Sequence, residues 1–392
     1  MPKISYDSRT IEPGDIFICL PKGEAFIEEA TARGASEVLE LTRADMATYA
    51  ADYYGRPSET LTVVGVTGTN GKTTVTYLVN MLLEKLGQTV AVSGTLSTAL
   101  TTPESLDLQR MMAEHLAKGG THFVMEVSSH GIDQNRVAEI DFDVTCLTNI
   151  SQDHLDYHPS FEDYKACKLR FMQSNGSRAQ IYPEDFETVD LPDQLPLLGS
   201  FNRQNLQAAV AIVTALGYSD ADILPLLPNL SAPPGRFEPV DCGQAFKVIV
   251  DYAHTPDALE NVLNTARELV PEGAKLCCVF GCGGDRDRSK RPLMGEIAAR
   301  LSDLIIVTSD NPRTEDPKQI IEDILAGVSG TTASTVIPDR QSAVETAIDR
   351  ARTGDVIVIA GKGHETYQLL PTGRIDFDDR EIARHYLTES DH

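Results

Sequence analysis

The sequence is poor in basic residues relative to acidic ones. Its 392 residues include 34 Lys and Arg against 58 Asp and Glu, which gives a formal net charge of −24. A surface that binds nucleic acid needs clustered Lys and Arg side chains to face the phosphates, so this composition argues against a nucleic-acid partner. An anionic ligand must instead be held by local basic residues in a cleft.

The sequence also lacks C-x-x-C pairs, repeats and long apolar runs. Its seven scattered cysteines indicate reduced thiols in a cytosolic protein rather than disulfides or a zinc site. No apolar run approaches the length of a membrane span, and the N-terminus has no signal-peptide core. We therefore expect a cytoplasmic protein without membrane insertion, and its length allows two or three domains.

The most informative stretch is residues 63–74, V-V-G-V-T-G-T-N-G-K-T-T, where an apolar strand breaks into a glycine-rich turn and then a helix. Gly68 and Gly71 let successive backbone N–H groups point into one concavity at the positive end of that helix. Lys72 can then reach the outer phosphates of a nucleotide, and the Thr73 hydroxyl can bind magnesium. A Gly-Lys-Thr triplet alone also fits an ordinary helix start, but the flanking strand and amphipathic helix favour a nucleotide site.

Apolar strands alternate with helices along most of the chain, which predicts an α/β fold with mostly parallel sheets covered on both faces. One of the expected helices lies near 219–227, and the segment S-A-P-P-G-R at 231–236 marks a boundary. We predict three domains: a small, reduced N-terminal α/β domain (1–58), a central P-loop ATPase-type domain (59–237) and a C-terminal Rossmann-like α/β domain (238–392).

Polar residues follow two of the predicted central strands. Glu126 lies at the end of a strand over 121–127, where open α/β sheets bind ligands, and can hold magnesium directly or through water. The alternative is a solvated strand-end glutamate. The next strand leads into T-N-I-S-Q-D-H-L-D-Y-H at 148–158, in which His154 is either a metal ligand or a packing residue.

Two helices carry further candidates. Lys168, taken by itself, is expected to be a solvated helix lysine. The segment G-S-F-N-R-Q-N at 199–205 starts a helix with amides at Asn202 and Asn205, one turn apart. Amide groups suit an adenine edge because they offer both a donor and an acceptor, although as a helix cap the motif means little.

The last domain ends four of its predicted strands in polar loops. Their charged tips, some on glycine-rich turns, are hard to explain as solvated loops, and we expect them to face one cleft. The loops are 251–256 (D-Y-A-H-T-P), 281–288 (G-C-G-G-D-R-D-R), 310–313 (D-N-P-R) and 361–365 (G-K-G-H-E).

Taken together, these motifs resemble the Mur ligase family, whose members are ATP-dependent enzymes that add amino acids to the peptidoglycan precursor. The resemblance runs from about residue 60 to the end of the chain. It is carried by T-G-T-N-G-K-T-T at 67–74, E-V-S-S-H at 126–130, the segment at 148–158, G-x-F-N-x-x-N at 199–205, P-G-R at 234–236, D-Y-A-H-T-P at 251–256 and G-G-D-R-D at 283–287.

Within the family, Thr101-Thr102-Pro103 and the D-N-P-R sequence resemble members that add the third amino acid and select meso-diaminopimelate. Arg313 can grip the second carboxylate of diaminopimelate, which lysine does not have.

The resemblance implies roles for individual residues. It places Lys168 as a carbamylated lysine, which would be an anionic metal ligand, and so contradicts the solvated reading. Catalytic roles fall to Lys72, Glu126, His154 and Lys168, and magnesium to Thr73, Glu126, His154 and Lys168. Nucleotide contacts fall to Gly68, Thr69, Asn70, Gly71, Lys72, Thr73, Thr74, Asn149, Asn205, Arg236 and Asp251. Substrate contacts fall to Ser8, Thr101, Thr102, Ser128, Gln134, Arg136, Arg286, Asp310, Asn311, Arg313, Gly361 and Glu365.

The implied reaction activates the side-chain carboxylate of D-glutamate in the UDP-muramoyl dipeptide as an acyl phosphate, with ATP and magnesium. The amine of meso-diaminopimelate then displaces phosphate and forms an amide. Because the ATP and amino-acid loops lie in different domains, we expect closure of the last domain to assemble the site of a monomeric enzyme.

The first domain departs from the family pattern. It is shorter than the roughly 100 residues implied by the resemblance. Ser8 is its most plausible uridine contact, and G-E-A-F at 23–26 replaces the expected glycine-histidine loop. Three other functions stay open: a lysine-adding ligase, a folylpolyglutamate synthase-like ligase, and a nucleotide-binding scaffold without ligase activity.

Overall fold

The computed structural model describes residues 2–151, 153–154, 157–174, 176–192, 195, 197–329 and 332–389. Gln152, Leu155 and Asp156, within the predicted loop at 148–158, lie outside the described residues. The chain forms two compact units, one of residues 1–194 and 204–230 and the other of residues 195–203 and 231–392. Each unit is described by itself.

The first unit begins with a small parallel sheet in the strand order β1-β2-β3. The apolar residues of β1 and β2 pack against α2, which starts at a capping box formed by Thr42 and Asp45. The Tyr6 hydroxyl donates to Asp107 Oδ2 of α4 at 2.6 Å, so this sheet is attached to the helix beside the central sheet. The elements are β1 (Ile4–Ser5), η1 (Ser8–Thr10), β2 (Ile16–Cys19), η2 (Glu24–Phe26), α1 (Ile27–Ala32), β3 (Glu37–Glu40), α2 (Arg43–Tyr53) and η3 (Pro57–Glu59).

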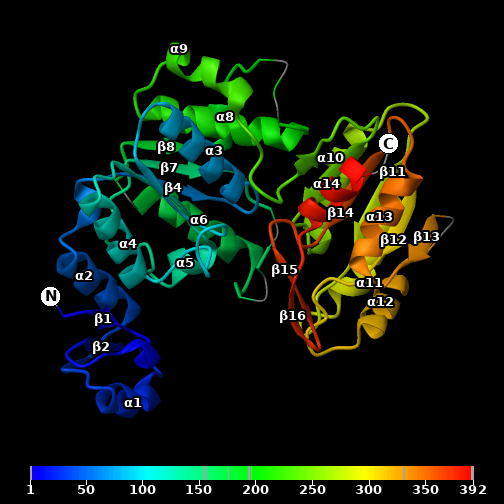
Figure 1. Ribbon diagram of the computed structural model, residues 1–392. Coiled ribbons are helices and arrows are strands. Elements are labelled where there is room, and N and C mark those ends of the chain that lie inside the picture. Colours follow the sequence, from blue (N-terminus) through cyan, green and yellow to red (C-terminus); the bar gives the residue numbers. More distant parts are fainter. Residues whose placement is uncertain are drawn as a thin grey trace. The chain divides into compact units, whose positions relative to one another are not determined.

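The central sheet has the strand order β5-β6-β4-β7-β8, and all of its strands are parallel. Its inner strands are apolar and buried along their length because helices cover both faces, with α3 on one side and α4 and α6 on the other (Figure 1). The strands are β4 (Thr62–Thr67), β5 (Val90–Ser93), β6 (His122–Glu126), β7 (Val144–Leu147) and β8 (Ala179–Ile181). The helices are α3 (Lys72–Lys85), α4 (Ser105–Ala117), α5 (Ser129–Asp133), α6 (Phe161–Ser174), α7 (Pro183–Phe186), α8 (Ser200–Ala215), α9 (Asp220–Ile223) and η4 (Leu224–Asn229).

The second unit is built on a sheet in the order β13-β12-β11-β14-β10-β9, in which only β9 runs antiparallel among the described strands. Helices α10, α11 and α12 pack on one face, whereas α13 and α14 pack on the other. The strands are β9 (Glu238–Val240), β10 (Lys247–Asp251), β11 (Leu276–Phe280), β12 (Leu304–Val307), β13 (Ala333–Val336) and β14 (Val356–Ala360), and the hairpin is β15 (Tyr367–Leu370) and β16 (Gly373–Asp376). The helices are α10 (Pro256–Glu268), α11 (Lys290–Leu301), α12 (Pro317–Leu325), α13 (Arg340–Arg350) and α14 (Asp379–Glu389).

A fully buried ion pair lies beneath the strand ends of the second unit. The Arg340 guanidinium donates to both carboxylate oxygens of Asp379 at 2.8 Å. The same group donates to the carbonyl of Ser309 at 3.3 Å and to that of Ala360 at 2.9 Å. Arg340 therefore ties together the ends of β12 and β14, from which two of the predicted polar loops emerge.

The α/β architecture and the parallel sheets confirm the prediction from the sequence. The helix predicted near 219–227 is wrong in part: only α9 is α-helical, and the chain continues as the 3-10 helix η4. Pro225 and Pro228 lack backbone N–H donors, which explains why the α-helix stops there.

Candidate active site

The predicted phosphate loop leads from β4 into α3, which begins at Lys72. Gly68 and Gly71 have φ angles of 146° and 86°, which favour glycine. A Cβ atom at Gly68 would lie 1.9 Å from Thr148 Oγ1, and one at Gly71 would lie 2.4 Å from Asn205 Oδ1. Both glycines are therefore required by backbone conformation and by space.

The segment after β7 holds this loop in place. The Thr69 and Asn70 backbone N–H groups donate to the carbonyl and side-chain oxygens of Asn149, both at 2.9 Å. The Thr69 hydroxyl lies 2.9 Å from the Tyr164 hydroxyl of α6. The Lys72 ammonium folds back over the loop and donates to two of its carbonyl oxygens at 2.9 Å.

Glu126 lies at the end of β6 with 1% of its surface exposed. Its Oε2 atom accepts from the Thr73 hydroxyl at 3.0 Å, and its Oε1 atom accepts from the Thr95 backbone N–H at 2.8 Å. A carboxylate and a hydroxyl beside a phosphate loop are hard oxygen donors, which fit magnesium. The part of the chain that the structure describes contains no group of three or more His, Cys, Asp or Glu side chains suited to a metal.

Lys168 on α6 lies in this same site. It is 1% exposed, its Nζ atom donates to the Gly68 carbonyl at 2.8 Å, and it lies 4.8 Å from the centre of the Tyr164 ring. Burial, followed by the nearby charge of Lys72, lowers the pKa of Lys168 to about 6. The interpretation of Lys168 as a solvated helix lysine is therefore wrong: the side chain is buried beside the phosphate loop and favours the neutral amine.

His154 belongs to a group of aromatic side chains near α5 and α6. Its ring centre lies 4.9 Å from that of His130 and 6.3 Å from that of Tyr164. Its Nε2 atom lies 3.5 Å from Asp153 Oδ2, and 44% of its side chain is exposed. His154 is thus accessible to a ligand and is not a buried packing residue.

Five residues assigned to the dipeptide substrate come together beside Glu126. The Thr102 hydroxyl donates to Ser128 Oγ at 3.0 Å, and Arg136 donates to the Thr102 carbonyl at 2.8 Å and to Gln134 Oε1 at 2.6 Å. The Thr101 hydroxyl lies 3.2 Å from that of Thr95, the residue that holds Glu126.

Glu104 also contacts this group, although no sequence motif predicted a role for it. Its Oε1 atom forms ion pairs with Arg136 at 3.3 Å and with Arg43 of α2 at 3.1 Å.

Ser8, in contrast, lies in η1 of the small sheet. It is buried, and its hydroxyl donates to Glu29 Oε2 at 2.7 Å.

In the second unit, the turn before β9 and the end of β10 form one cluster. The Arg236 guanidinium lies 4.7 Å from the centre of the Tyr252 ring. The buried Asp251 carboxylate accepts from the backbone N–H groups of Phe237 and Ala253, both at 2.7 Å, and burial raises its pKa. Asp251 therefore fixes the backbone that presents Arg236 and Tyr252.

The loops after β12 and β14 form a second cluster. Asn311 donates to Glu365 Oε2 at 2.9 Å, and a Cβ atom at Gly361 would lie 2.7 Å from Asp310 Oδ2. The fully buried Lys362, which lies in the predicted loop at 361–365 and was given no role, donates to Glu365 Oε2 at 3.0 Å and to Asn311 Oδ1 at 3.2 Å. Four of the predicted acceptor residues are thus in contact.

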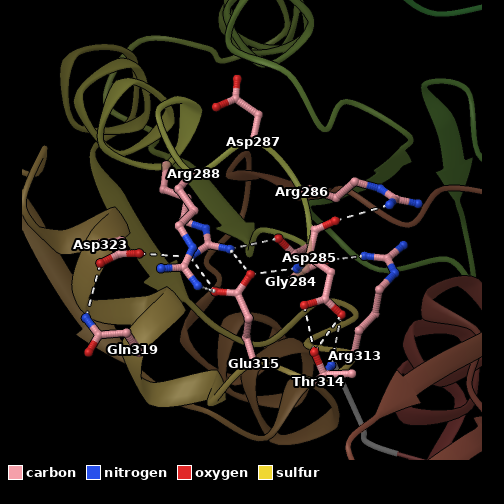
Figure 2. Close-up of polar contacts among 12 residues, drawn as sticks. Gly284, Asp285, Arg286, Asp287, Arg288, Arg313, Thr314, Glu315, Gln319 and Asp323 are labelled. Atoms are coloured by element: carbon pink, nitrogen blue, oxygen red, sulfur yellow. Dashed lines mark hydrogen bonds and ion pairs between the residues drawn. The ribbon is translucent and has the colours of Figure 1, made fainter.

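The two predicted acceptor arginines flank the turn after β11. Arg313 donates from Nη1 to the Gly284 carbonyl at 2.8 Å, and Arg286 donates from Nη1 to the Asp285 carbonyl of the same turn at 3.2 Å (Figure 2). A Cβ atom at Gly283 would lie 2.8 Å from Arg313 Nη1 and 3.8 Å from Arg286 Cγ. Glycine at this position therefore allows both side chains to approach the turn.

The fold and the phosphate loop define a nucleotide-binding α/β enzyme. The Mur ligase middle domain matches residues 66–190, and the Mur ligase glutamate ligase domain matches residues 235–363. A relative from Syntrophomonas wolfei, "UDP-N-acetylmuramoyl-L-alanyl-D-glutamate--2,6-diaminopimelate ligase", is 42% identical over 98% of this chain and 94% of its own. A relative of the same name from Geobacillus thermodenitrificans is 39% identical over the same shares. The chain belongs to the Mur ligase family.

Solved structures agree with this assignment. A structure titled as the same diaminopimelate ligase has a TM-score of 0.66 and 34% identity, covering 100% of this chain and 95% of its own. The MurF ligase of Thermotoga maritima in complex with ADP shares the fold, with a TM-score of 0.65, 17% identity, and coverage of 99% of this chain and 98% of its own.

Two further findings concern length and hydropathy. The alignment with the S. wolfei relative extends over 461 positions, more than the 392 residues of this chain, so the relative carries internal residues that this chain lacks. Among the described residues, no helix is both long and apolar enough to span a membrane.

Proposed function

We propose that this chain is an ATP-dependent ligase that joins meso-2,6-diaminopimelate to UDP-N-acetylmuramoyl-L-alanyl-D-glutamate in peptidoglycan precursor synthesis. The activity named for relatives that align with 98% of the chain supports this function. The structural observation that supports this function is the buried Lys168 amine, which donates a hydrogen bond to the Gly68 carbonyl of the phosphate loop and lies close to the Lys72 charge.

ATP binds at the phosphate loop. Backbone N–H groups of the loop face the phosphates, and Lys72 exchanges its two carbonyl partners for phosphate oxygens. Magnesium would be held by Thr73, Glu126, His154 and modified Lys168, and when bound it would neutralise charge on the phosphates.

Lys168 acts in this proposal as a carbamate. Its neutral nitrogen attacks carbon dioxide, a C–N bond forms, and the nitrogen loses a proton, which leaves an anionic carbamate. Burial favours the neutral amine that this step requires, since protonation would place a charge in an apolar environment.

The dipeptide substrate is held beside Glu126 by the hydrogen-bonded group of Thr101, Thr102, Ser128, Gln134 and Arg136. Its side-chain carboxylate attacks the γ-phosphorus of ATP, which gives an acyl phosphate and ADP. The amine of diaminopimelate then attacks the acyl carbon, and phosphate leaves as the amide forms. Positive charge from Lys72 stabilises the transferring phosphoryl group.

Diaminopimelate is bound by the loops of the second unit. Arg313 and Arg286 offer guanidinium groups for its carboxylates, and the Asn311 and Glu365 pair offers an acceptor for its ammonium group. Asn205, Arg236 and Asp251 serve the adenosine end of ATP, and Ser8 serves the uridine end of the precursor. The enzyme is a cytoplasmic monomer with domains at 1–58, 59–237 and 238–392.

The test is phosphate release with ATP, magnesium and the UDP-dipeptide, using meso-diaminopimelate or L-lysine as the acceptor. Amide formation with diaminopimelate and little with L-lysine supports the proposal. Amide formation mainly with L-lysine would indicate the lysine-adding alternative, and turnover only with a folate substrate and L-glutamate would indicate a folylpolyglutamate synthase-like enzyme. No amide with any acceptor would favour the non-catalytic scaffold.

A further inference from the structure

The loops after β11 and β12 each contain a strained residue. Asp285 and Arg313 both have φ angles of 54°, in the left-handed region that non-glycine residues rarely adopt. Such conformations persist only where surrounding contacts determine them. The contacts around Asp285 and Arg313 therefore show how the two loops are held in these conformations.

Reciprocal hydrogen bonds join the two loops (Figure 2). The Gly284 N–H donates to the Asn311 carbonyl at 2.9 Å, while Arg313 Nη1 donates to the Gly284 carbonyl at 2.8 Å. The Asp285 carboxylate accepts from the Thr314 backbone N–H at 3.1 Å and from the Thr314 hydroxyl at 2.7 and 2.9 Å. Thr314, the residue next to Arg313, is thus held directly by the turn after β11, and we call this contact between Asp285 and Thr314 the clamp.

Glu315 anchors this clamp to the core of the unit. It accepts from the Asp285 N–H at 2.6 Å and from the fully buried Arg291 guanidinium at 2.9 and 3.1 Å. Arg291 also binds Asp323 of α12 at 2.8 Å, so the contacts continue into two helices. The hydrogen bonds from Arg291 lower the pKa of Glu315 to about 2, which keeps this carboxylate ionised at neutral pH.

The clamp determines which edge of the Arg313 guanidinium is available. The backbone N–H of Arg313 donates to the Leu369 carbonyl at 3.0 Å, and its Nη1 atom donates to the carbonyls of Gly284 and Asn311. Within the described residues, Nε and Nη2 of Arg313 have no hydrogen-bond partner. These two atoms form one side of the guanidinium group, which can bind a carboxylate with two parallel hydrogen bonds.

We propose that Asp285, anchored through Glu315, is a positioning residue that fixes the Nε and Nη2 edge of Arg313 for the second carboxylate of the acceptor amino acid. This inference rests on the proposed function and adds a determinant of specificity to it. A bidentate contact depends on placement within a fraction of an ångström, so loosening the clamp weakens acceptor binding while leaving the nucleotide site intact.

The test uses Thr314→Val and Asp285→Asn in the full-length protein. Valine keeps the β-branched shape of threonine but removes the hydroxyl, and asparagine tolerates a positive φ while losing the carboxylate charge. We expect the KM for meso-diaminopimelate to rise about tenfold, with KM values for ATP and the UDP-dipeptide unchanged within twofold. Thr314→Ser, which keeps the hydroxyl, should restore a value close to wild type.

Asp287→Asn is the matched control. Asp287 lies on the same turn, but its carboxylate accepts only from the Ser289 N–H and hydroxyl, at 2.8 and 2.6 Å, and makes no contact with the other loop among the described residues. The same chemical change there should leave the KM for diaminopimelate within twofold of wild type.

A double-mutant comparison separates positioning from a general structural role. In an Arg313→Ala background, Thr314→Val should raise the KM for diaminopimelate no further, because the group that it positions is absent. Equal losses in both backgrounds, or an unchanged KM in both Thr314→Val and Asp285→Asn, would overturn the inference. A wild-type enzyme without diaminopimelate-dependent phosphate release would instead contradict the proposed function.

Discussion

Replacing Lys168 by alanine should abolish ligase activity, and added formate or a similar small acid should partly restore it. Alanine removes the amine that we propose to be carbamylated and leaves a space beside the phosphate loop, because Lys168 is 1% exposed and contacts the Gly68 carbonyl. A small carboxylate that enters this space would supply the missing anionic oxygens.

The lowered pKa of Lys168 gives a magnitude for the population of neutral amine that carbamylation requires. The pKa of Lys168 falls from 10.5 to about 6, so burial favours the neutral amine by about 6 kcal/mol more than the environment of an exposed lysine does. At pH 7.5 the neutral fraction therefore rises from roughly 0.1% to nearly all of the molecules. The amine that can attack carbon dioxide is thus about a thousand times more abundant than for an exposed lysine.

The assay is phosphate release by wild type, Lys168→Ala and Lys165→Ala, each with and without formate. Lys165 is an exposed lysine on the same helix, so its replacement should leave activity unchanged. Wild-type protein incubated with ¹³C-labelled bicarbonate should also show a carbamate carbon by NMR that is absent from Lys168→Ala. Loss of activity without rescue by formate, together with no such signal, would refute the reasoning.

The lowered pKa of Lys168 also predicts that stability and activity depend on pH. Its folded-state pKa lies below that of the unfolded chain, so between pH 6 and 10.5 the unfolded state binds more protons. The contribution of Lys168 to the free energy of unfolding should therefore increase as the pH rises through this window. Activity should fall below about pH 6, where the amine becomes protonated, and a pH–rate profile that is flat from 5 to 8 would contradict this expectation.

Three further predictions concern specificity, stability and the nucleotide site. Arg313→Ala should reduce discrimination between diaminopimelate and L-lysine by about 2 kcal/mol, or roughly thirtyfold in the ratio of kcat/KM values, and unchanged selectivity would remove Arg313 from its role. Arg340→Met should lower the free energy of unfolding in urea by about 3–5 kcal/mol because it leaves the Asp379 charge buried alone, and adding Asp379→Leu should recover most of this loss. Gly68→Ala should weaken ADP binding at least tenfold by calorimetry, whereas Gly87→Ala, which has a φ of 83° but no atom near its Cβ position, should bind normally.

Much of the architecture was predictable because the central strands are short, mostly apolar runs separated by helices of regular period. β4 and β11 are examples, since every residue of β11 is buried and its alternation with α10 and α11 is plain in the sequence. The edge strands β3 and β13 were missed, since they mix polar and apolar residues and their outer sides lie in solvent. The hairpin of β15 and β16 was missed for a similar reason, as all of β16 is exposed.

The site was predictable only in part. The glycines of the phosphate loop have a local physical signature, whereas the burial of Lys168 was missed. A signal was nevertheless present: Tyr164 and Phe171 lie four residues before and three residues after Lys168, on the same helix face, and both are buried. The roles of Glu315 and Lys362 could not be foreseen, because their partners come from distant segments that only the fold brings together.

The buried pair of Arg340 and Asp379 bears on how this protein can be shortened. Asp379 is the first residue of α14, so a chain truncated before it would leave an unneutralised guanidinium in the apolar interior under the ends of β12 and β14. An affinity tag placed after residue 389 keeps that partner, but deletion of α14 does not. The terminal helix is therefore part of the support of the acceptor loops rather than a dispensable tail.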